Sequence, residues 1–199
     1  MSYVLGITGG IASGKSTVVN VFRSYDFPIV DGDVVARRVV EPETPGLLAL
    51  VNVFGDSIIT PEGTLDRKKL GSLIFQDETE RKKLNQTLEP FIRSEIDRQI
   101  EIAKKNSPLV IADIPLLYES DYKKQMDAVA VVYTDQSTQL KRLMARNQLS
   151  EVEAMNRINS QMSLEEKKQL ADIVFDNRGS LDETADQVIE WLKKHTFIE

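Results

Sequence analysis

The sequence contains no cysteine. A disulfide framework, a thiolate zinc site and a catalytic thiol are therefore excluded. The sequence also lacks a run of the roughly 20 apolar residues that a membrane-spanning helix needs. Its first residues show no basic segment followed by a long apolar region and a cleavage site. We therefore expect a cytoplasmic chain that does not enter a membrane.

Basic residues are fewer than acidic ones. Lys and Arg together number 25 against 31 Asp and Glu, which gives a net charge of -6. This balance argues against broad electrostatic binding to nucleic acid, so a polyanionic ligand would have to meet a local cluster of basic side chains. The remaining composition is that of a globular protein, because 41% of the 199 residues are hydrophobic and 28% are charged. No feature indicates an obligatory protein partner.

Apolar runs alternate with helical patterns along the chain. Residues 3–8 predict a strand, 9–14 a glycine-rich turn and 15–25 a helix. Further strands are expected at residues 28–31, 109–114, 128–133 and 173–175. Because these runs are apolar almost throughout, they favour a parallel sheet that helices cover on both faces. The predicted fold class is α/β, with a five-stranded parallel sheet flanked by helices.

Several helix starts carry a recognisable signal. Four pairs of residues have the spacing of a capping box. They are Asp77 with Glu80, Ser150 with Glu153, Ser163 with Glu166, and Ser180 with Glu183. Pro90 suits the first turn of a further helix, where the missing N–H of proline is tolerated.

Residues 9–16 read GGIASGKS, which matches the phosphate-binding pattern G-x-x-x-x-G-K-[ST] between a predicted strand and a predicted helix. Such a loop turns successive backbone N–H groups toward one point, and the helix N-terminus adds a favourable dipole. Lys15 would reach the β- and γ-phosphates, and Ser16 would coordinate Mg²⁺. The expected ATP-binding residues of the loop are Gly10, Ile11, Ala12, Ser13, Gly14, Lys15, Ser16 and Thr17. The fold is therefore expected to be that of a P-loop NTPase, similar to the nucleoside monophosphate kinases.

Two stretches do not fit a minimal sheet. Residues 34–105 form a long, mostly helical insertion, which we interpret as a substrate-binding region. Residues 147–170 form a charged helical excursion, which we interpret as a lid. The nucleotide-binding core would then consist of residues 1–33, 106–146 and 171–199.

Asp113 ends one of the predicted strands, where a carboxylate can lie behind the magnesium ion. Taken alone, it could equally be an ordinary capping or loop aspartate. The chain has neither the Asn-Lys-x-Asp motif of switch GTPases nor a Leu-Ser-Gly-Gly-Gln run. A small chain with a basic, lid-like helix favours a kinase acting on a metabolite. Another nucleotide or nucleoside as acceptor, or a slow nucleotide-dependent switch that binds a protein, remain alternatives.

Five groups of residues resemble, in the same order, the motifs of the dephospho-CoA kinase family. They are residues 7–17; 30–33 with Ala36 and Arg37; 63–67; 113–119, which read DIPLLYE; and Arg142, Arg146, Arg157, Gln161, Ala171, Asp172 and Asn177. The resemblance covers nearly the whole chain. It implies Mg²⁺-dependent transfer of the γ-phosphate of ATP to the ribose 3′-hydroxyl of dephospho-CoA, the last step of CoA biosynthesis.

The resemblance also implies roles for single residues. Asp33 would accept the proton of the acceptor hydroxyl, and Lys15 and Arg142 would complete the catalytic set. Arg142, Arg146 and Asn177 would join the ATP-binding residues, and Ser16 and Asp113 would bind the metal. The expected substrate-binding residues are Asp33, Arg67, Arg93, Pro115, Leu116, Leu117 and Glu119.

Plainer roles are open for three of these residues. Asp33 could cap a helix that starts near residue 34. Arg67 could be surface charge, although a basic first helical turn opposes the helix dipole and therefore suggests an anionic ligand. Arg142 could pair with acidic residues of a neighbouring helix. The sequence departs from the family pattern at Glu89, where the family usually has histidine, and at Gly32, where it has alanine or cysteine.

Overall fold

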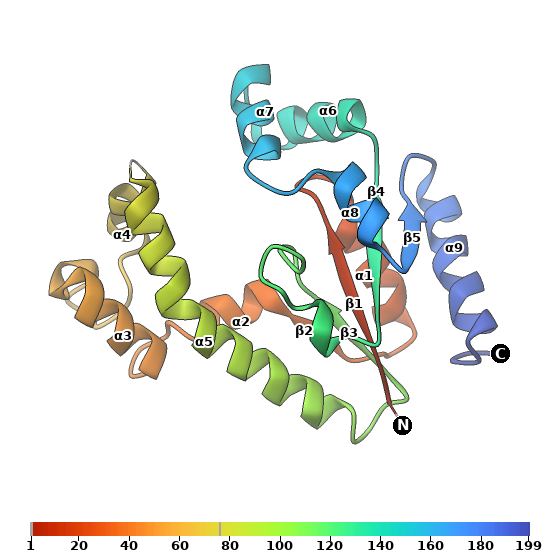
Figure 1. The fold of residues 1–199 in the computed structure, drawn as a ribbon, viewed down its shortest axis with the longest axis horizontal. Helices are drawn as coiled ribbons and strands as arrows, with labels where there is room; N and C mark the ends of the chain where they lie inside the picture. Colours follow the sequence, from red (N-terminus) through yellow and green to blue (C-terminus); the bar gives the residue numbers. More distant parts are fainter. Residues whose placement is uncertain (1, 76) are drawn as a thin grey trace. The chain divides into compact units, whose positions relative to one another are not determined.

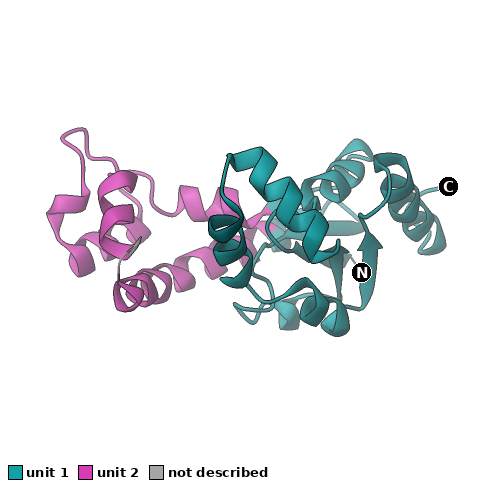
Figure 2. Ribbon diagram, turned by 90° about the horizontal axis from the view of Figure 1, so that it is seen from above, with its two compact units in different colours: residues 1–30, 100–199 teal, residues 31–99 magenta. Residues whose placement is uncertain are grey.

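The structure is a computed structural model that describes residues 2–75 and 77–199. The chain divides into two compact units, which Figure 2 distinguishes by colour. Unit 1 contains Met1–Val30 and Ile100–Glu199, and unit 2 contains Asp31–Gln99.

A five-stranded sheet with the strand order β2-β3-β1-β4-β5 forms the centre of the first unit (Figure 1). The strands are β1 (Tyr3–Gly9), β2 (Ile29–Asp31), β3 (Leu109–Asp113), β4 (Ala128–Tyr133) and β5 (Ile173–Asp176). The pairs β1–β3, β1–β4 and β4–β5 are parallel. Every residue of β3 and β4 is buried, which explains why these strands are apolar throughout instead of alternating with polar residues. The predicted α/β class is confirmed.

Alternate residues of the strands face two different sets of helices. On one face Leu5, Ile7 and Val132 share a core with α1 (Lys15–Ser24) and α9 (Leu181–Lys194). On the other face Val131 and Tyr133 pack with Leu164 of α8 (Leu164–Leu170). This division follows from the two-residue period of a strand, which points neighbouring side chains to opposite faces.

Residues 147–170, the predicted lid, contain α7 (Glu151–Asn159) and α8. Ala154 and Ile158 of α7 are buried with Leu143 of α6 (Gln136–Asn147). Capping boxes begin both helices, as the sequence predicts, at Ser150 and Ser163, and another begins α9 at Ser180. A short 3₁₀ helix, η2 (Lys123–Gln125), precedes β4.

The second unit is helical. It contains α2 (Gly32–Arg38), α3 (Pro45–Phe54), the 3₁₀ helix η1 (Asp56–Ile58), α4 (Arg67–Phe75) and most of α5 (Glu78–Ala103). The expectation that Pro90 starts a helix is wrong, because α5 runs through it for 26 residues. The helix instead begins after Asp77, whose carboxylate accepts a 2.7 Å hydrogen bond from the Thr79 N–H. None of the helices in residues 2–75 and 77–199 is long and apolar enough to cross a membrane.

Candidate active site

The glycine-rich loop joins β1 to α1 at the carboxyl ends of the parallel strands. Gly14 has a φ of +89° and occupies the N-cap position of α1 without a side-chain cap. A Cβ at this position would lie 1.9 Å from the Nδ2 atom of Asn177, so only glycine fits. The loop therefore presents the uncapped N-terminus of a helix, which is a suitable site for a phosphate group.

Lys15 and Asp113 form an ion pair at the carboxyl ends of these strands. The parallel pairing of β1 with β3 aligns Ile7 with Asp113, which brings the end of β3 next to the loop. The Asp113 side chain is 8% exposed and that of Lys15 is 20% exposed. The residue expected to contact the phosphates and the residue expected behind the metal are therefore in direct contact.

Asn177 and Arg142 lie on the other side of the loop. The Asn177 amide donates a 2.8 Å hydrogen bond to the Ser13 carbonyl, and its own oxygen accepts one of 2.9 Å from the Thr184 hydroxyl. Arg142 donates a 3.1 Å bond to the Asn177 carbonyl through Nη2. The structure thus brings Asn177 and Arg142 together with the phosphate loop, as expected for ATP-binding residues.

The two arginines of α6 differ in their surroundings. The Nη1 atom of Arg142 is buried and has no hydrogen-bond partner within the described part of the chain. Arg146 is exposed, and its Nε donates a 2.9 Å bond to Asn147. Among the described residues, neither Arg142 nor Arg146 forms an ion pair with Glu151 or Glu153 of the neighbouring helix α7, so the alternative of pairing between helix surfaces is not supported. Arg142 therefore keeps a donor group that a ligand can use.

Two glutamines hold the tip of the loop at Ile11. The Ile11 N–H donates a 2.9 Å hydrogen bond to Gln161, and the Ile11 carbonyl accepts one of 2.7 Å from Gln139. Gln139 is 4% exposed, and we did not predict its role. A signal was present in the sequence, because Gln139 lies four residues before the buried Leu143 and so occupies a core position of α6.

The residues of the segment that reads DIPLLYE have different surroundings. Leu117 is fully buried, whereas Leu116 is 42% exposed. The Pro115 carbonyl accepts a 2.8 Å hydrogen bond from the Thr8 hydroxyl. Glu119, expected to bind substrate, is paired with Lys167 at 2.9 Å. Of these residues, Leu116 has the side chain most open to a ligand.

Within the second unit, Asp31 rather than Asp33 caps α2. Its Oδ1 accepts hydrogen bonds of 2.9 Å and 3.0 Å from the N–H groups of Asp33 and Val34. Asp33 lies in the first turn of α2 and is exposed. The plainer alternative of Asp33 as the helix cap is therefore wrong, because a different aspartate has that function.

The expected acceptor-binding arginines are on α4 and α5. Arg67 is the first residue of α4, and Asp66 before it accepts a 2.9 Å hydrogen bond from the Lys69 N–H. Arg93 pairs with Glu89 at 2.5 Å. The residue that departs from the family pattern at position 89 therefore holds Arg93 by an i, i+4 ion pair.

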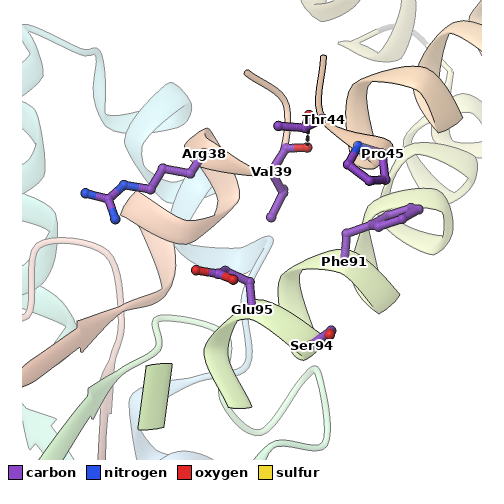
Figure 3. A pocket seen from close by; sticks show the side chains of 8 residues that line it. Arg38, Val39, Thr44, Pro45, Phe91, Ser94 and Glu95 are labelled. Atoms are coloured by element: carbon purple, nitrogen blue, oxygen red, sulfur yellow. Dashed lines mark hydrogen bonds between the residues drawn. The ribbon is translucent and has the colours of Figure 1, made fainter. Parts of the chain in front are cut away.

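A cavity of about 320 Å³ lies within unit 2 (Figure 3). Val39, Pro45 and Phe91 provide an apolar wall, and Arg38 and Glu95 lie toward the opposite end. The pKa of Glu95 is lowered to about 2, first by hydrogen bonds from Arg98 and Gln99 and to a lesser extent by the charge of Arg38. The cavity thus combines an apolar wall with one basic and one acidic side chain, Arg38 and Glu95.

The chain matches known proteins over nearly its full length. A family model described as dephospho-CoA kinase matches residues 3–183. The chain is 58% identical over 194 residues to a dephospho-CoA kinase from Enterococcus faecalis, with 98% of each chain covered.

Two solved structures are similar to it in fold. A dephospho-CoA kinase from Campylobacter jejuni has a TM-score of 0.76 and 29% identity, and the match covers 98% of each chain. A shikimate kinase from Aquifex aeolicus shares the fold alone, with a TM-score of 0.51 and 14% identity over 97% of this chain and 98% of its own. With the phosphate loop, the Lys15–Asp113 pair and the position of Asn177, these matches show that the chain belongs to the dephospho-CoA kinase family of P-loop kinases, whose members phosphorylate dephospho-CoA to CoA in the last step of CoA biosynthesis.

Proposed function

We propose that this protein transfers the γ-phosphoryl group of ATP to the ribose 3′-hydroxyl of dephospho-CoA, giving CoA and ADP. The observation that carries the proposal is the contact between Lys15 and Asp113 beside an uncapped helix N-terminus. In the reaction, a bond forms between the 3′-oxygen and the γ-phosphorus, and the bond from that phosphorus to the β–γ bridging oxygen breaks. ADP leaves, and the hydroxyl proton passes to a base.

The residues around the loop would supply most of the stabilisation. Transfer proceeds through a loose transition state, so catalysis depends mainly on positioning and on neutralising charge. Lys15 would neutralise charge on the β- and γ-phosphates. The unpartnered Nη1 group of Arg142 supports a role as a further donor to the triphosphate. Asn177 would border the nucleotide while it holds the loop at Ser13.

Magnesium is part of this proposal. The hydroxyl of Ser16 and the carboxylate of Asp113 are oxygen donors, which are the ligands that Mg²⁺ prefers. Mg²⁺ in kinases is usually bound by one or two protein groups together with substrate phosphates. The described residues contain no group of three or more His, Asp or Glu side chains that could hold a metal, in keeping with a site that ATP helps to complete. When bound, the ion would neutralise charge on the phosphate oxygens.

We assign the acceptor to the second unit. Asp33 is the candidate base, because its carboxylate is exposed and is not the cap of α2. Arg67 and Arg93 are candidate partners for the acceptor diphosphate. The apolar wall at Phe91 suits the pantetheine arm of dephospho-CoA, although a volume of about 320 Å³ can hold only part of such a ligand. Because the phosphoryl donor is ATP, we also propose that the enzyme works in the cytoplasm.

A coupled assay of ADP release tests the proposal. ADP should form rapidly with ATP, Mg²⁺ and dephospho-CoA together, and slowly when dephospho-CoA is omitted. Adenosine, AMP and shikimate serve as control acceptors of other kinase classes. ADP release that is the same with and without dephospho-CoA would contradict the proposal and would favour a nucleotide-dependent switch.

A further inference from the structure

Lys167 is a buried lysine outside the expected ATP- and acceptor-binding sets. Its side chain, on α8, is 0% exposed. The Nζ atom donates hydrogen bonds of 3.3 Å to the Gly9 carbonyl and 3.0 Å to the Pro115 carbonyl, and it pairs with Glu119 at 2.9 Å. Burial lowers the pKa of Lys167, and the hydrogen bond and charge of Glu119 oppose this effect. Removing a cation from water costs free energy, so the burial of Lys167 suggests that its contacts have a function.

The two carbonyls that Lys167 contacts are next to the phosphate site. Gly9 is the last residue of β1 and the first of the phosphate loop, and Pro115 follows Asp113 by two residues. These strands are neighbours in the sheet, and the Ile114 N–H donates a 3.0 Å hydrogen bond to the Ile7 carbonyl. Lys167 therefore links the ends of the two strands on which Lys15 and Asp113 depend for their positions.

Glu119 extends the same connection to the start of α8. Its Oε1 accepts a 3.1 Å hydrogen bond from the Met162 N–H in addition to the pair with Lys167. One residue before Met162, Gln161 accepts the hydrogen bond from the Ile11 N–H. Residues 161–167 thus hold the phosphate loop at two points, Gly9 and Ile11, and Glu119 anchors this segment.

We propose that Lys167 and Glu119 are positioning residues for phosphoryl transfer. The pair fixes the ends of β1 and β3 relative to each other, so that Lys15 and Asp113 meet the phosphates and the metal in one geometry. This assigns Glu119 a function that acts through Lys167 instead of the direct substrate contact expected from the sequence. The inference rests on the proposed function, because positioning contributes so much to phosphoryl transfer.

The test compares variants that separate positioning from folding. Lys167→Met alone removes one member of the ion pair and leaves the Glu119 carboxylate, which is 22% exposed, without its cation, so some loss of stability is expected. The double variant Lys167→Met/Glu119→Met removes both charges, and such replacements often preserve stability. Glu119→Gln keeps an acceptor for both hydrogen bonds but removes the charge. Lys168→Met is the matched control, since Lys168 is exposed on the same helix. For each variant we would measure the melting temperature, kcat and the KM for each substrate.

We expect the double variant to melt near the wild type while its kcat falls about tenfold to a hundredfold, because small displacements at a reacting centre have effects of this size. The KM for dephospho-CoA should be unchanged, and Lys168→Met should behave as the wild type. A folded double variant with wild-type kcat would show that the pair is only structural and would overturn the proposal.

Two further outcomes are separable. If the double variant does not fold, the Glu119→Gln variant tests the proposal instead. A reduced kcat at a wild-type melting temperature supports a positioning role, and a wild-type kcat overturns it. If the wild type forms no ADP in response to dephospho-CoA, the proposed function fails instead. In that case, the ATP dissociation constant of the double variant, measured by calorimetry, still tests the effect of Lys167 on the phosphate loop. A disturbed loop should bind ATP severalfold more weakly than the wild type. An unchanged dissociation constant would overturn the proposal.

Discussion

The amide of Asn177 fills the space that a side chain at Gly14 would need, because its Nδ2 atom lies 1.9 Å from the position of a Gly14 Cβ. The same amide donates a hydrogen bond to Ser13, so the close approach also stabilises the loop. We expect Gly14→Ala to weaken ATP binding at least tenfold and to destabilise the protein by about 2 kcal/mol or more, from the left-handed φ and the clash together. Calorimetric ATP titration and thermal unfolding measure the two effects.

Gly63→Ala is the control for this experiment. Gly63 has a similar φ of +79°, but no atom lies within 4 Å of the place where its Cβ would be. The variant should therefore show only the cost of the backbone conformation, about 1 kcal/mol, with wild-type ATP affinity. Equal loss of ATP affinity in both variants would mean that the contact with Asn177 is not responsible.

Lys15→Ala tests the phosphate-loop chemistry. Lys15 should stabilise charge that develops on the transferred phosphoryl group, so we expect kcat to fall by at least about a hundredfold. The variant also leaves the Asp113 carboxylate, a side chain only 8% exposed, without this ion pair, so a clear decrease in melting temperature should accompany the loss. Measuring kcat well below the melting transition separates the two effects. Near-normal turnover would contradict the assignment of Lys15.

The sequence was sufficient to predict the sheet and the phosphate loop. The run at residues 109–114 was expected to be a strand and β3 is Leu109–Asp113, because a strand buried on both faces leaves an uninterrupted apolar run. The capping boxes at Ser150, Ser163 and Ser180 were also correct, since they depend only on contacts three residues apart.

The sequence was not sufficient where a role depends on contacts between distant residues. Lys167 reads as one more charged residue of a solvated helix, yet it contacts Gly9, 158 residues away. The cap of α2 depends on which of two aspartates, Asp31 or Asp33, precedes the first helical residue, and a shift of two residues is beyond what the pattern can resolve. Pro90 was misplaced because proline is usually confined to the first turn of a helix, whereas α5 continues through it.

Closure of the predicted lid can be measured by hydrogen exchange. Within residues 147–170, Lys167 and Leu164 are buried in unit 1, whereas Val152 of α7 is 70% exposed. We therefore expect a non-hydrolysable ATP analogue with Mg²⁺ to slow exchange mainly in α7 and the turn before it, as a lid closes over the nucleotide. Helix α9 serves as the internal reference. Exchange in α7 that does not change with the analogue would contradict a lid function.

The cavity of unit 2 predicts a selective effect on the acceptor. Phe91→Ala removes a large part of its apolar wall, so we expect the KM for dephospho-CoA to rise about tenfold while the KM for ATP stays constant. Leu48→Ala is the control, because Leu48 is 59% exposed and does not line the cavity. A parallel rise in both KM values, or the same rise in the control, would show that the cavity is not specific for the acceptor.

Asp33→Asn tests the chemistry at the acceptor hydroxyl. Asparagine keeps the size of the side chain and some hydrogen bonding but loses the basicity and the charge of the carboxylate. If Asp33 orients the 3′-hydroxyl and accepts its proton, kcat should fall by about a hundredfold to ten-thousandfold, with little change in ATP affinity.

The structure supplies the comparison that makes this result decisive. Asp31 caps α2 through two backbone hydrogen bonds, so Asp31→Ala should lower the free energy of unfolding by about 1 kcal/mol. If Asp33 contributed only a negative charge to the first turn of α2, Asp33→Asn would lose at most about 1 kcal/mol of stability and would retain full activity. Kinetic constants and melting temperatures of the two variants therefore separate a base from a helix-stabilising charge, and full activity of Asp33→Asn would exclude the catalytic role.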